Sequence, residues 1–260
     1  MQFAKKSLGQ NFLIDKNIIK KIINIIDVEN KNIIEIGAGK GALTNEIIKR
    51  NPKSLTIIEK DFYLSKELNL KYKNNKIVKI YNFDVLKLNI EKLCRKNSVI
   101  FGNLPYNISS QILVKILKFK KWPPKFTDLI LMFQKELGEK ILGKFPSANY
   151  GRLSILTSYR LKILKKFLVS PSCFLPKPKV TSLVIHFKPQ LSTIILKDIS
   201  NLEKITNIIF SNKRKMINKN IKKILSKKDI LLINNLKLNL RPAEIEPEIF
   251  YKIAKLYEKR

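Results

Sequence analysis

The chain alternates short runs of β-branched residues with segments whose apolar residues recur at helical spacing. This pattern is typical of an α/β fold, in which crossover helices connect the strands of one sheet. The predicted strands cover residues 32–36, 54–59, 76–81, 98–102, 128–134, 162–168 and 180–187. The predicted helices between them cover residues 42–50, 62–72, 109–118, 135–142 and 151–160. Since no long helix separates the last two strands, we expect them to form an antiparallel hairpin at one sheet edge.

The strand pattern stops after about residue 189, and helical spacing continues to the end of the chain. Four helices are predicted there, at residues 197–211, 214–226, 228–236 and 246–258. We therefore expect two domains, an α/β domain over residues 1–189 and a small all-helical domain over 190–260. Lys213, Arg214 and Lys215 open the second of these helices, and this basic stripe suits either phosphate binding or a solvated helix face.

The charge of the chain is strongly positive, with 52 Lys and Arg against 20 Asp and Glu and a net charge of +32. Such an excess favours a polyanionic partner, although an anionic membrane surface would satisfy the same sign. Lys, Ile and Asn are all abundant, and A- and T-rich codons encode all three. Composition therefore supports nucleic-acid binding without establishing it.

The cysteines, the single histidine and the short apolar runs indicate in which compartment the protein works and whether it binds a metal or spans a membrane. Cys94 and Cys173 are too few for a disulfide framework and lack metal-ligand spacing, so we expect a reducing compartment and no metal. No apolar run is long enough to span a membrane, and the N-terminus has no long apolar core. We expect a cytoplasmic protein without a membrane partner. His186, the single histidine, lies in a predicted strand and is interpreted as structural.

Four residues between the fourth predicted strand and the next helix point most directly to chemistry: Asn103, Leu104, Pro105 and Tyr106. The Asn103 amide oxygen and a carbonyl in the Pro-containing turn can together accept both hydrogens of an exocyclic amine. The aromatic ring of Tyr106 can stack on a flat base. This arrangement predicts a site that modifies an amino group on a nucleobase.

A glycine-rich turn follows the first predicted strand and contains Gly37, Gly39 and Gly41. Such glycines let the backbone approach a ligand closely. Glu59, at the end of the second strand, is placed to accept hydrogen bonds from two ribose hydroxyls. This pair fits either a nicotinamide cofactor or S-adenosylmethionine. The third glycine follows the second by two residues, not three, which argues against the dinucleotide fingerprint.

Asp84 follows the third predicted strand and could accept a hydrogen bond from the amino group of a bound adenine. Alone, such a residue is more often a helix cap or turn residue. Together with Gly37 and Glu59, however, it places polar groups at three successive strand ends. Ligands of open α/β sheets bind at these carboxyl ends.

These motifs resemble the S-adenosylmethionine-dependent ribosomal RNA adenine dimethyltransferases of the kasugamycin-sensitivity family, nearly from end to end. The opening segment, residues 6–15, resembles the N-terminal motif of that family, and residues 174–182 resemble its Phe-Pro-Pro-Val-Ser segment beside the target base. The resemblance implies a Rossmann-like methyltransferase sheet, which an antiparallel end distinguishes from a plain dinucleotide fold. It also implies S-adenosylmethionine as cofactor and an RNA-binding helical C-terminal domain.

The family's functional residues carry over position by position. The resemblance implies that the cofactor is held by Asn11, Leu13, Gly37, Glu59, Asp84 and Asn103. The implied catalytic residues are Asn103, Leu104, Pro105, Tyr106 and Phe174. Tyr106 would stack on the flipped adenine and Phe174 would cover its other face. The chain departs from the family at Ala38, where Pro is common, and in one additional residue near Asn51 and Pro52.

The implied reaction is direct methyl transfer to two adjacent adenines in a hairpin near the 3′ end of small-subunit ribosomal RNA. No dedicated general base is expected, because the amine proton becomes acidic once its nitrogen is alkylated. The implied substrate is a nearly assembled small ribosomal subunit, and the family precedent is a monomer. The alternatives are a large-subunit methyltransferase of the macrolide-resistance type and a non-catalytic ribosome-assembly factor. A nicotinamide-dependent oxidoreductase is a third and more remote alternative.

Overall fold

The computed structural model of the protein describes residues 10–259. The described chain divides into two compact units. Unit 1 contains residues 10–116, 124–138 and 163–189, and unit 2 contains residues 117–123, 139–162 and 190–259. The chain passes into unit 2 for the last time after residue 189, where the sequence predicts its domain boundary. Two earlier segments also belong to unit 2.

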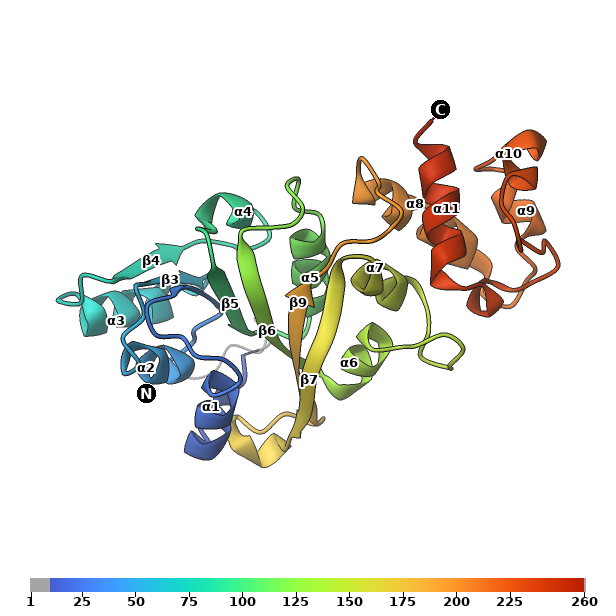
Figure 1. The fold of residues 1–260 in the computed structure, drawn as a ribbon. Coiled ribbons are helices and arrows are strands. Elements are labelled where there is room, and N and C mark those ends of the chain that lie inside the picture. The colour runs from blue at the N-terminus through green and yellow to red at the C-terminus, as the bar shows by residue number, and fades with distance from the viewer. Residues whose placement is uncertain (1–9, 260) are drawn as a thin grey trace. The chain divides into compact units, whose positions relative to one another are not determined.

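Unit 1 is built on a seven-stranded sheet of order β4-β3-β2-β5-β6-β9-β7 (Figure 1). Its strands are β2 (Asn32–Ile36), β3 (Ser54–Glu59), β4 (Val78–Asn82), β5 (Ser98–Asn103), β6 (Phe126–Gln134), β7 (Leu161–Val169) and β9 (Ser182–Pro189). The helices that accompany them are α1 (Lys16–Ile23), α2 (Ala42–Ile48), α3 (Phe62–Tyr72), α4 (Ile90–Leu93), α5 (Ser109–Leu117) and α6 (Lys135–Ile141). The predicted strands and helices of this region are confirmed to within a few residues.

The parallel part of the sheet forms because its strands are apolar on both faces. Ile33 and Val99 on one face, and Ile34 and Ile100 on the other, are each at most 2% exposed. Parallel strands covered by helices on both sides read as nearly continuous apolar runs, and these runs carried the prediction. β2 pairs in parallel with β3 on one side and β5 on the other. The strand order reverses there, and open α/β sheets bind ligands at such a point.

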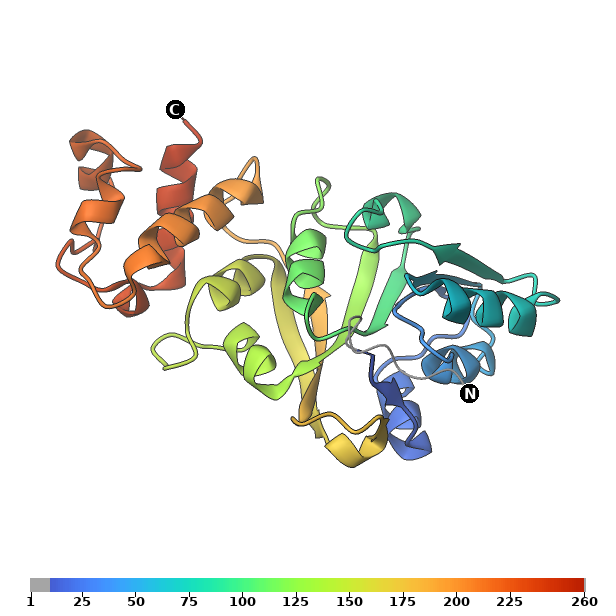
Figure 2. The ribbon, with the colours of Figure 1, turned by 180° about the vertical axis from the view of Figure 1, so that it is seen from behind.

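The sheet ends as the sequence predicts, with its last two strands side by side. β9 is antiparallel to β6, and β7 is the other neighbour of β9 and lies at the edge. Figure 2 shows the same strands from behind. A separate two-stranded ribbon pairs β1 (Phe12–Leu13) with β8 (Phe174–Leu175), which follows the short helix η2 (Pro171–Cys173). This ribbon joins two segments that are far apart in sequence.

Unit 2 is helical and packs around aromatic residues. It contains α7 (Arg152–Arg160), α8 (Ile199–Ile209), η3 (Phe210–Asn212), α9 (Asn218–Ile221), α10 (Lys227–Leu231), η4 (Pro242–Glu244) and α11 (Pro247–Tyr257). Tyr159 of α7 meets Tyr251 of α11 with ring centroids 4.9 Å apart, and Phe210 stacks on Phe250 at 5.6 Å. Such pairs add to the burial of these large side chains.

The helix predicted over residues 214–226 is wrong for most of its length. Residues 213–217 form turns, and only α9 is helical. Ile217 and Ile221 are nevertheless fully buried, and the Ile217 N–H donates to the Leu240 carbonyl at 2.9 Å. The apolar spacing is therefore satisfied by successive turns and not by one continuous helix. Lys213, Arg214 and Lys215 are exposed but do not form a helical stripe.

Residues 10–259 bear on two expectations from the sequence, those concerning a membrane span and a metal site. None of the helices in this range combines the length and apolar composition needed to cross a membrane. The same residues contain no group of three or more His, Cys, Asp or Glu side chains that could hold a metal ion.

Candidate active site

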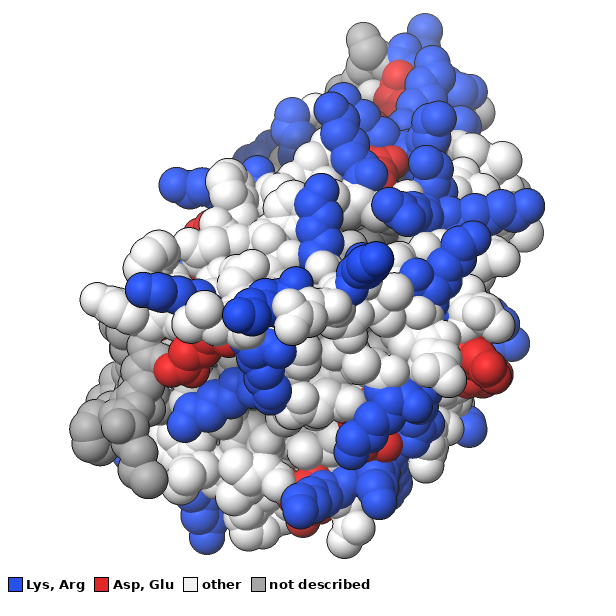
Figure 3. Space-filling view, turned by 90° about the vertical axis from the view of Figure 1, so that its left-hand side faces the viewer, with Lys and Arg blue, Asp and Glu red and all other residues white. Residues whose placement is uncertain are grey.

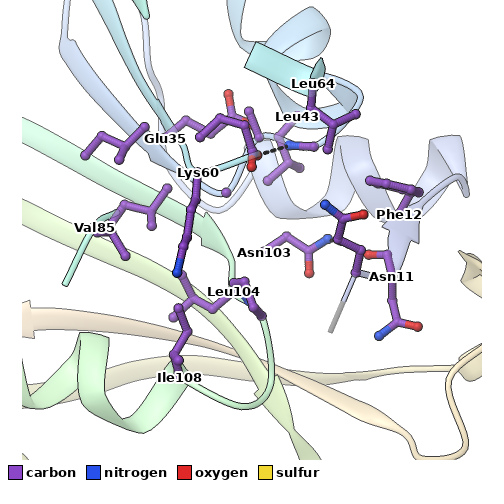
Figure 4. Close-up of a pocket in the computed structure, with 18 of the residues that line it drawn as sticks. Asn11, Phe12, Glu35, Leu43, Lys60, Leu64, Val85, Asn103, Leu104 and Ile108 are labelled. Carbon is purple, nitrogen blue, oxygen red and sulfur yellow. Dashed lines mark hydrogen bonds between the residues drawn. The ribbon is translucent and has the colours of Figure 1, made fainter. Parts of the chain in front are cut away.

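A pocket lies in unit 1 at the carboxyl ends of the parallel strands, on both sides of the point where their order reverses (Figure 4). Nine of the ten residues that the sequence assigns to the site line it: Asn11, Leu13, Gly37, Glu59, Asp84, Asn103, Leu104, Pro105 and Tyr106. Phe174 is not among the lining residues. Of the N-terminal motif, residues 6–9 lie outside the described part of the chain.

The glycine turn between β2 and α2 has a backbone that other residues rarely adopt. Gly37 has φ +73° and Gly39 has φ +57°. A Cβ at Gly37 would lie 3.3 Å from the Asn103 carbonyl oxygen, and one at Gly39 would lie 3.0 Å from the Phe12 ring. Both glycines are therefore needed, because they let the turn follow the ends of β5 and β1 closely.

Glu59, the last residue of β3, is buried and holds this turn in place. Its carboxylate accepts hydrogen bonds from the N–H groups of Gly39 and Asp61, both at 2.9 Å. Burial raises the pKa of Glu59, and these two hydrogen bonds oppose that rise. The carboxylate is thus fixed before any ligand binds, and its remaining lone pairs can accept ribose hydroxyls.

A second buried carboxylate, Glu35 on β2, also lines the pocket and was not predicted as a site residue. The Thr44 hydroxyl of α2 donates to it at 2.6 Å. Burial raises the pKa of Glu35 from 4.5 to about 7, although the Thr44 hydrogen bond opposes the shift. The sequence signal for this residue was its place two positions before Gly37, inside an otherwise apolar strand.

Asp84, beyond the end of β4, is paired with a lysine that sequence reasoning missed. The Lys60 Nζ lies 2.9 Å from one Asp84 carboxylate oxygen, and the Leu86 N–H donates to the other at 2.9 Å. The hydrogen bond from Lys60 holds the pKa of Asp84 below its usual value. Lys60 follows Glu59 directly, so the ends of β3 and β4 carry two acidic residues and one basic residue at the pocket. Figure 4 shows the Lys60 side chain there.

Asn103 ends β5 on the other side of the pocket. Its side-chain amide faces Asn11, near the first residue that the structure describes. Its Nδ2 donates to the Asn11 carbonyl at 3.3 Å, and Figure 4 shows the two residues next to each other. Because the amide nitrogen is engaged there, the amide oxygen remains as an acceptor. The Pro105 carbonyl accepts from the Ile108 N–H at 3.2 Å within the turn that follows.

The two aromatic residues predicted to enclose the base differ in their surroundings. Tyr106 is half-buried at the pocket, and its hydroxyl is hydrogen-bonded to the Ser182 hydroxyl at 2.6 Å. Phe174 lies opposite Leu13 in the register of β1 and β8 and is only 2% exposed. Its role against the base stays a prediction from the motif.

His186 is in the sheet, as expected, and not in the pocket. Its Nε2 lies 2.8 Å from a carboxylate oxygen of Asp128 on β6, and both side chains are buried. Burial raises the pKa of Asp128, but the hydrogen bond from His186 opposes this and the net shift is downward. This pair therefore links β6 to β9 within the sheet.

Among solved structures, the chain resembles a dimethyladenosine transferase from Plasmodium falciparum, with a TM-score of 0.75 and 25% identity over 93% of this chain and 95% of the other. It also shares the fold of the 23S rRNA methyltransferase ErmE, with a TM-score of 0.69 and 22% identity over 95% and 99% of the two chains. These likenesses confirm the predicted Rossmann-like methyltransferase fold.

Sequence comparison is more specific. The chain is 44% identical to the ribosomal RNA small subunit methyltransferase A of Pelagibacter ubique, over 98% of this chain and 97% of the relative. It is 38% identical to the protein of that name from Mycoplasma mobile, over 96% of each. A family model described as ribosomal RNA adenine dimethylase matches residues 1–259. The chain therefore belongs to the ribosomal RNA adenine dimethylase family.

Proposed function

We propose that this protein dimethylates the exocyclic amines of two adjacent adenines in small-subunit ribosomal RNA, with S-adenosylmethionine as methyl donor. The observation that carries the proposal is a single pocket shared by two groups of residues. Carboxylates suited to a nucleoside, Glu59 and Asp84, line it together with the amine acceptor Asn103 and the aromatic ring of Tyr106. The membership of the family supports the same reaction.

The residues present fit S-adenosylmethionine. Gly37 and Gly39 let the turn lie close to Asn103 and Phe12 at the pocket, and Glu59 is fixed at the end of β3 to accept the ribose hydroxyls. Asp84 is assigned to the adenine amine of the cofactor, and Asn11 and Leu13 to its other end. When bound, the cofactor supplies an electrophilic methyl group on a sulfonium. The protein's task is then to orient the amine that receives it.

Asn103 orients the target amine. Its Nδ2 is held by the Asn11 carbonyl, so its Oδ1 is the atom that accepts a hydrogen from the amine. We assign the second acceptor to the Leu104 carbonyl, because the Pro105 carbonyl already accepts from Ile108. Two acceptors fix the direction of the nitrogen lone pair and favour a pyramidal nitrogen. After the first methylation one acceptor loses its hydrogen, so the monomethylated amine must rotate before the second.

The base must leave its stack to reach these groups, at a cost of about a few kcal/mol that is least in loops and ends. Tyr106 compensates part of that cost by stacking on the flipped base, and we retain Phe174 as the residue beside its other face. The proposed target is accordingly a hairpin loop near the 3′ end of the RNA. No general base is assigned.

The RNA would be held mainly through phosphates. Lys and Arg far outnumber Asp and Glu on the face of the protein shown in Figure 3. Exposed basic residues of unit 2, such as Lys213, Arg214 and Lys219, would add to this surface. We infer that a monomer acts in the cytoplasm on a nearly assembled small subunit and that unit 2 provides much of the RNA contact.

Two alternatives are less well supported. Large-subunit methylation would share the pocket, but the only support for it is the fold likeness to ErmE, whereas the relatives in sequence are named for the small subunit. A non-catalytic assembly factor would have no need of the complete set Gly37, Glu59, Asp84, Asn103 and Tyr106, all of which line one pocket.

The test is transfer of labelled methyl from S-adenosylmethionine to small and large ribosomal subunits that lack the modification. We expect label in the small subunit only, and its loss with Asn103→Ala. Label in the large subunit would support the first alternative. Binding of the small subunit without any transfer would support the second.

A further inference from the structure

Ser182, the first residue of β9, is fully buried and touches the residue proposed to stack on the base. Its hydroxyl lies 2.6 Å from the Tyr106 hydroxyl. We propose that Ser182 is a positioning residue that holds the Tyr106 ring in place over the target adenine. This inference rests on the proposed function. It adds Ser182 to the residues that act in the proposed reaction.

The position of Ser182 is fixed by main-chain contacts on two sides. It pairs with Gln134 in the antiparallel register of β6 and β9. The Lys135 N–H donates to the carbonyl of the preceding residue, Thr181, at 2.9 Å. The next residue, Leu183, packs so closely on α6 that a Cβ at Gly138 would lie 2.6 Å from it. The backbone of Ser182 is therefore fixed, and full burial limits where its hydroxyl can lie.

The backbone of Tyr106 is also held. The turn that contains it is closed by the Ile108 N–H, which donates to the Pro105 carbonyl at 3.2 Å. The Ser109 hydroxyl donates to the Tyr106 carbonyl at 3.1 Å. What remains free in a tyrosine with a fixed backbone is rotation about its two side-chain torsions. The hydroxyl lies on the axis of the second torsion, so its hydrogen bond to Ser182 restrains the first torsion and with it the position of the ring.

The function of this hydrogen bond follows from what stacking requires. A ring that swings about its first torsion meets the base at many positions, and only a fraction of them leave the amine facing Asn103 and Leu104. The cofactor residues Glu59 and Asp84 make their hydrogen bonds elsewhere in the pocket. Loss of the hydrogen bond between the Tyr106 and Ser182 hydroxyls should therefore lower the rate of methyl transfer without changing the affinity for the cofactor.

The experiment is a double-mutant cycle with Ser182→Ala, Tyr106→Phe and the combined variant. Methyl transfer to unmodified small subunits gives kcat and the KM for the particle, and calorimetry gives the affinity for S-adenosylmethionine. We expect each single variant to lower kcat about 3- to 10-fold, the range of one net hydrogen bond. The combined variant should be no slower than either one, because both remove the same bond. Cofactor affinity should remain unchanged.

Two further variants separate positioning from simple destabilisation. Ser182→Thr keeps the hydroxyl and should restore most of the rate, whereas Ser110→Ala, which removes a nearby hydroxyl of α5, should leave it unchanged. If Tyr106→Phe transfers methyl at the original rate, or if the two losses multiply in the combined variant, the role of Ser182 is overturned. Tyr106→Phe decides the matter even if Ser182→Ala does not fold. Absence of transfer by the unsubstituted protein would instead overturn the proposed function.

Discussion

The two sides of the pocket hold their polar groups by different physical means. On the proposed cofactor side, Glu35, Glu59 and Asp84 are carboxyl groups held by backbone N–H groups, a hydroxyl and one lysine. On the base side, Asn103, Leu104 and Tyr106 offer neutral groups held by a carbonyl and a hydroxyl. This difference suits a charged cofactor and a neutral amine. It also predicts that substitutions on the two sides will affect different measurements.

The largest effect should come from the base side. Asn103→Ala removes the amine acceptor, and we expect methyl transfer to fall by about 100- to 1,000-fold, as when one preorganised polar group is removed from other active sites. Cofactor affinity, measured by calorimetry, should change much less. Asn17→Ala, at an exposed position of α1, is the matched control. A loss of affinity as large as the loss of rate would contradict the division of the pocket into two sides.

The next effect concerns pH on the cofactor side. The pKa of Glu35 is raised from 4.5 to about 7, so the folded protein binds a proton there that the unfolded chain releases between these values. Stability therefore falls as pH rises through this window, and ionised Glu35 costs about 3 kcal/mol above it. Glu35→Gln should stabilise the protein about 2 to 3 kcal/mol more at about pH 8 than at about pH 5.

Urea unfolding of both proteins at the two pH values measures this difference. Glu67→Gln, on the exposed face of α3, controls for the loss of one carboxylate. An equal effect of Glu35→Gln at both pH values would show that Glu35 is ionised throughout and would remove the basis for its raised pKa.

Glu59→Gln should have an intermediate effect. The carboxylate accepts from two N–H groups, whereas an amide places its own N–H₂ against one of them. We expect a loss of about 10- to 100-fold in affinity for S-adenosylmethionine, together with about 1–3 kcal/mol of stability. Calorimetry and urea unfolding measure the two. Unchanged affinity would exclude Glu59 from the cofactor site.

The smallest effect is expected for Lys60→Met. The Lys60 side chain is 54% exposed, and exposed ion pairs contribute little. Affinity for the cofactor should change by less than about threefold, and by less still at high salt. Lys66→Met on α3 is the control, and calorimetry at two salt concentrations is the measurement. A loss of more than about tenfold would mean that Lys60 itself contacts the ligand.

The sequence predicted the sheet well for a physical reason. Strands such as β2 and β5 are buried on both faces, and continuous apolar runs record that burial directly. The segment around α9 was less predictable, because the spacing of Ile217 and Ile221 fits both a long helix and a series of turns. That choice depends on contacts such as the one from Ile217 to Leu240, which are remote in sequence.

The same limit applies within the site. Residues at strand ends, such as Gly37 and Glu59, were predictable because parallel strands bring their carboxyl ends together. The hydrogen-bond partners of the site residues could not be predicted in this way. The pairs Lys60 with Asp84, and Ser182 with Tyr106, join segments whose distance is set by the folded sheet. No local spacing encodes them.

We propose that the neutral side of the pocket holds the exocyclic amine of an adenine. The most direct test is to digest small-subunit RNA after labelled methyl transfer and to separate its nucleosides. We predict that the label is found in N6,N6-dimethyladenosine, with the monomethylated form as a precursor. Label on cytosine, or on a ring nitrogen of adenine, would contradict the assignment of Asn103 and Leu104 as acceptors of that amine.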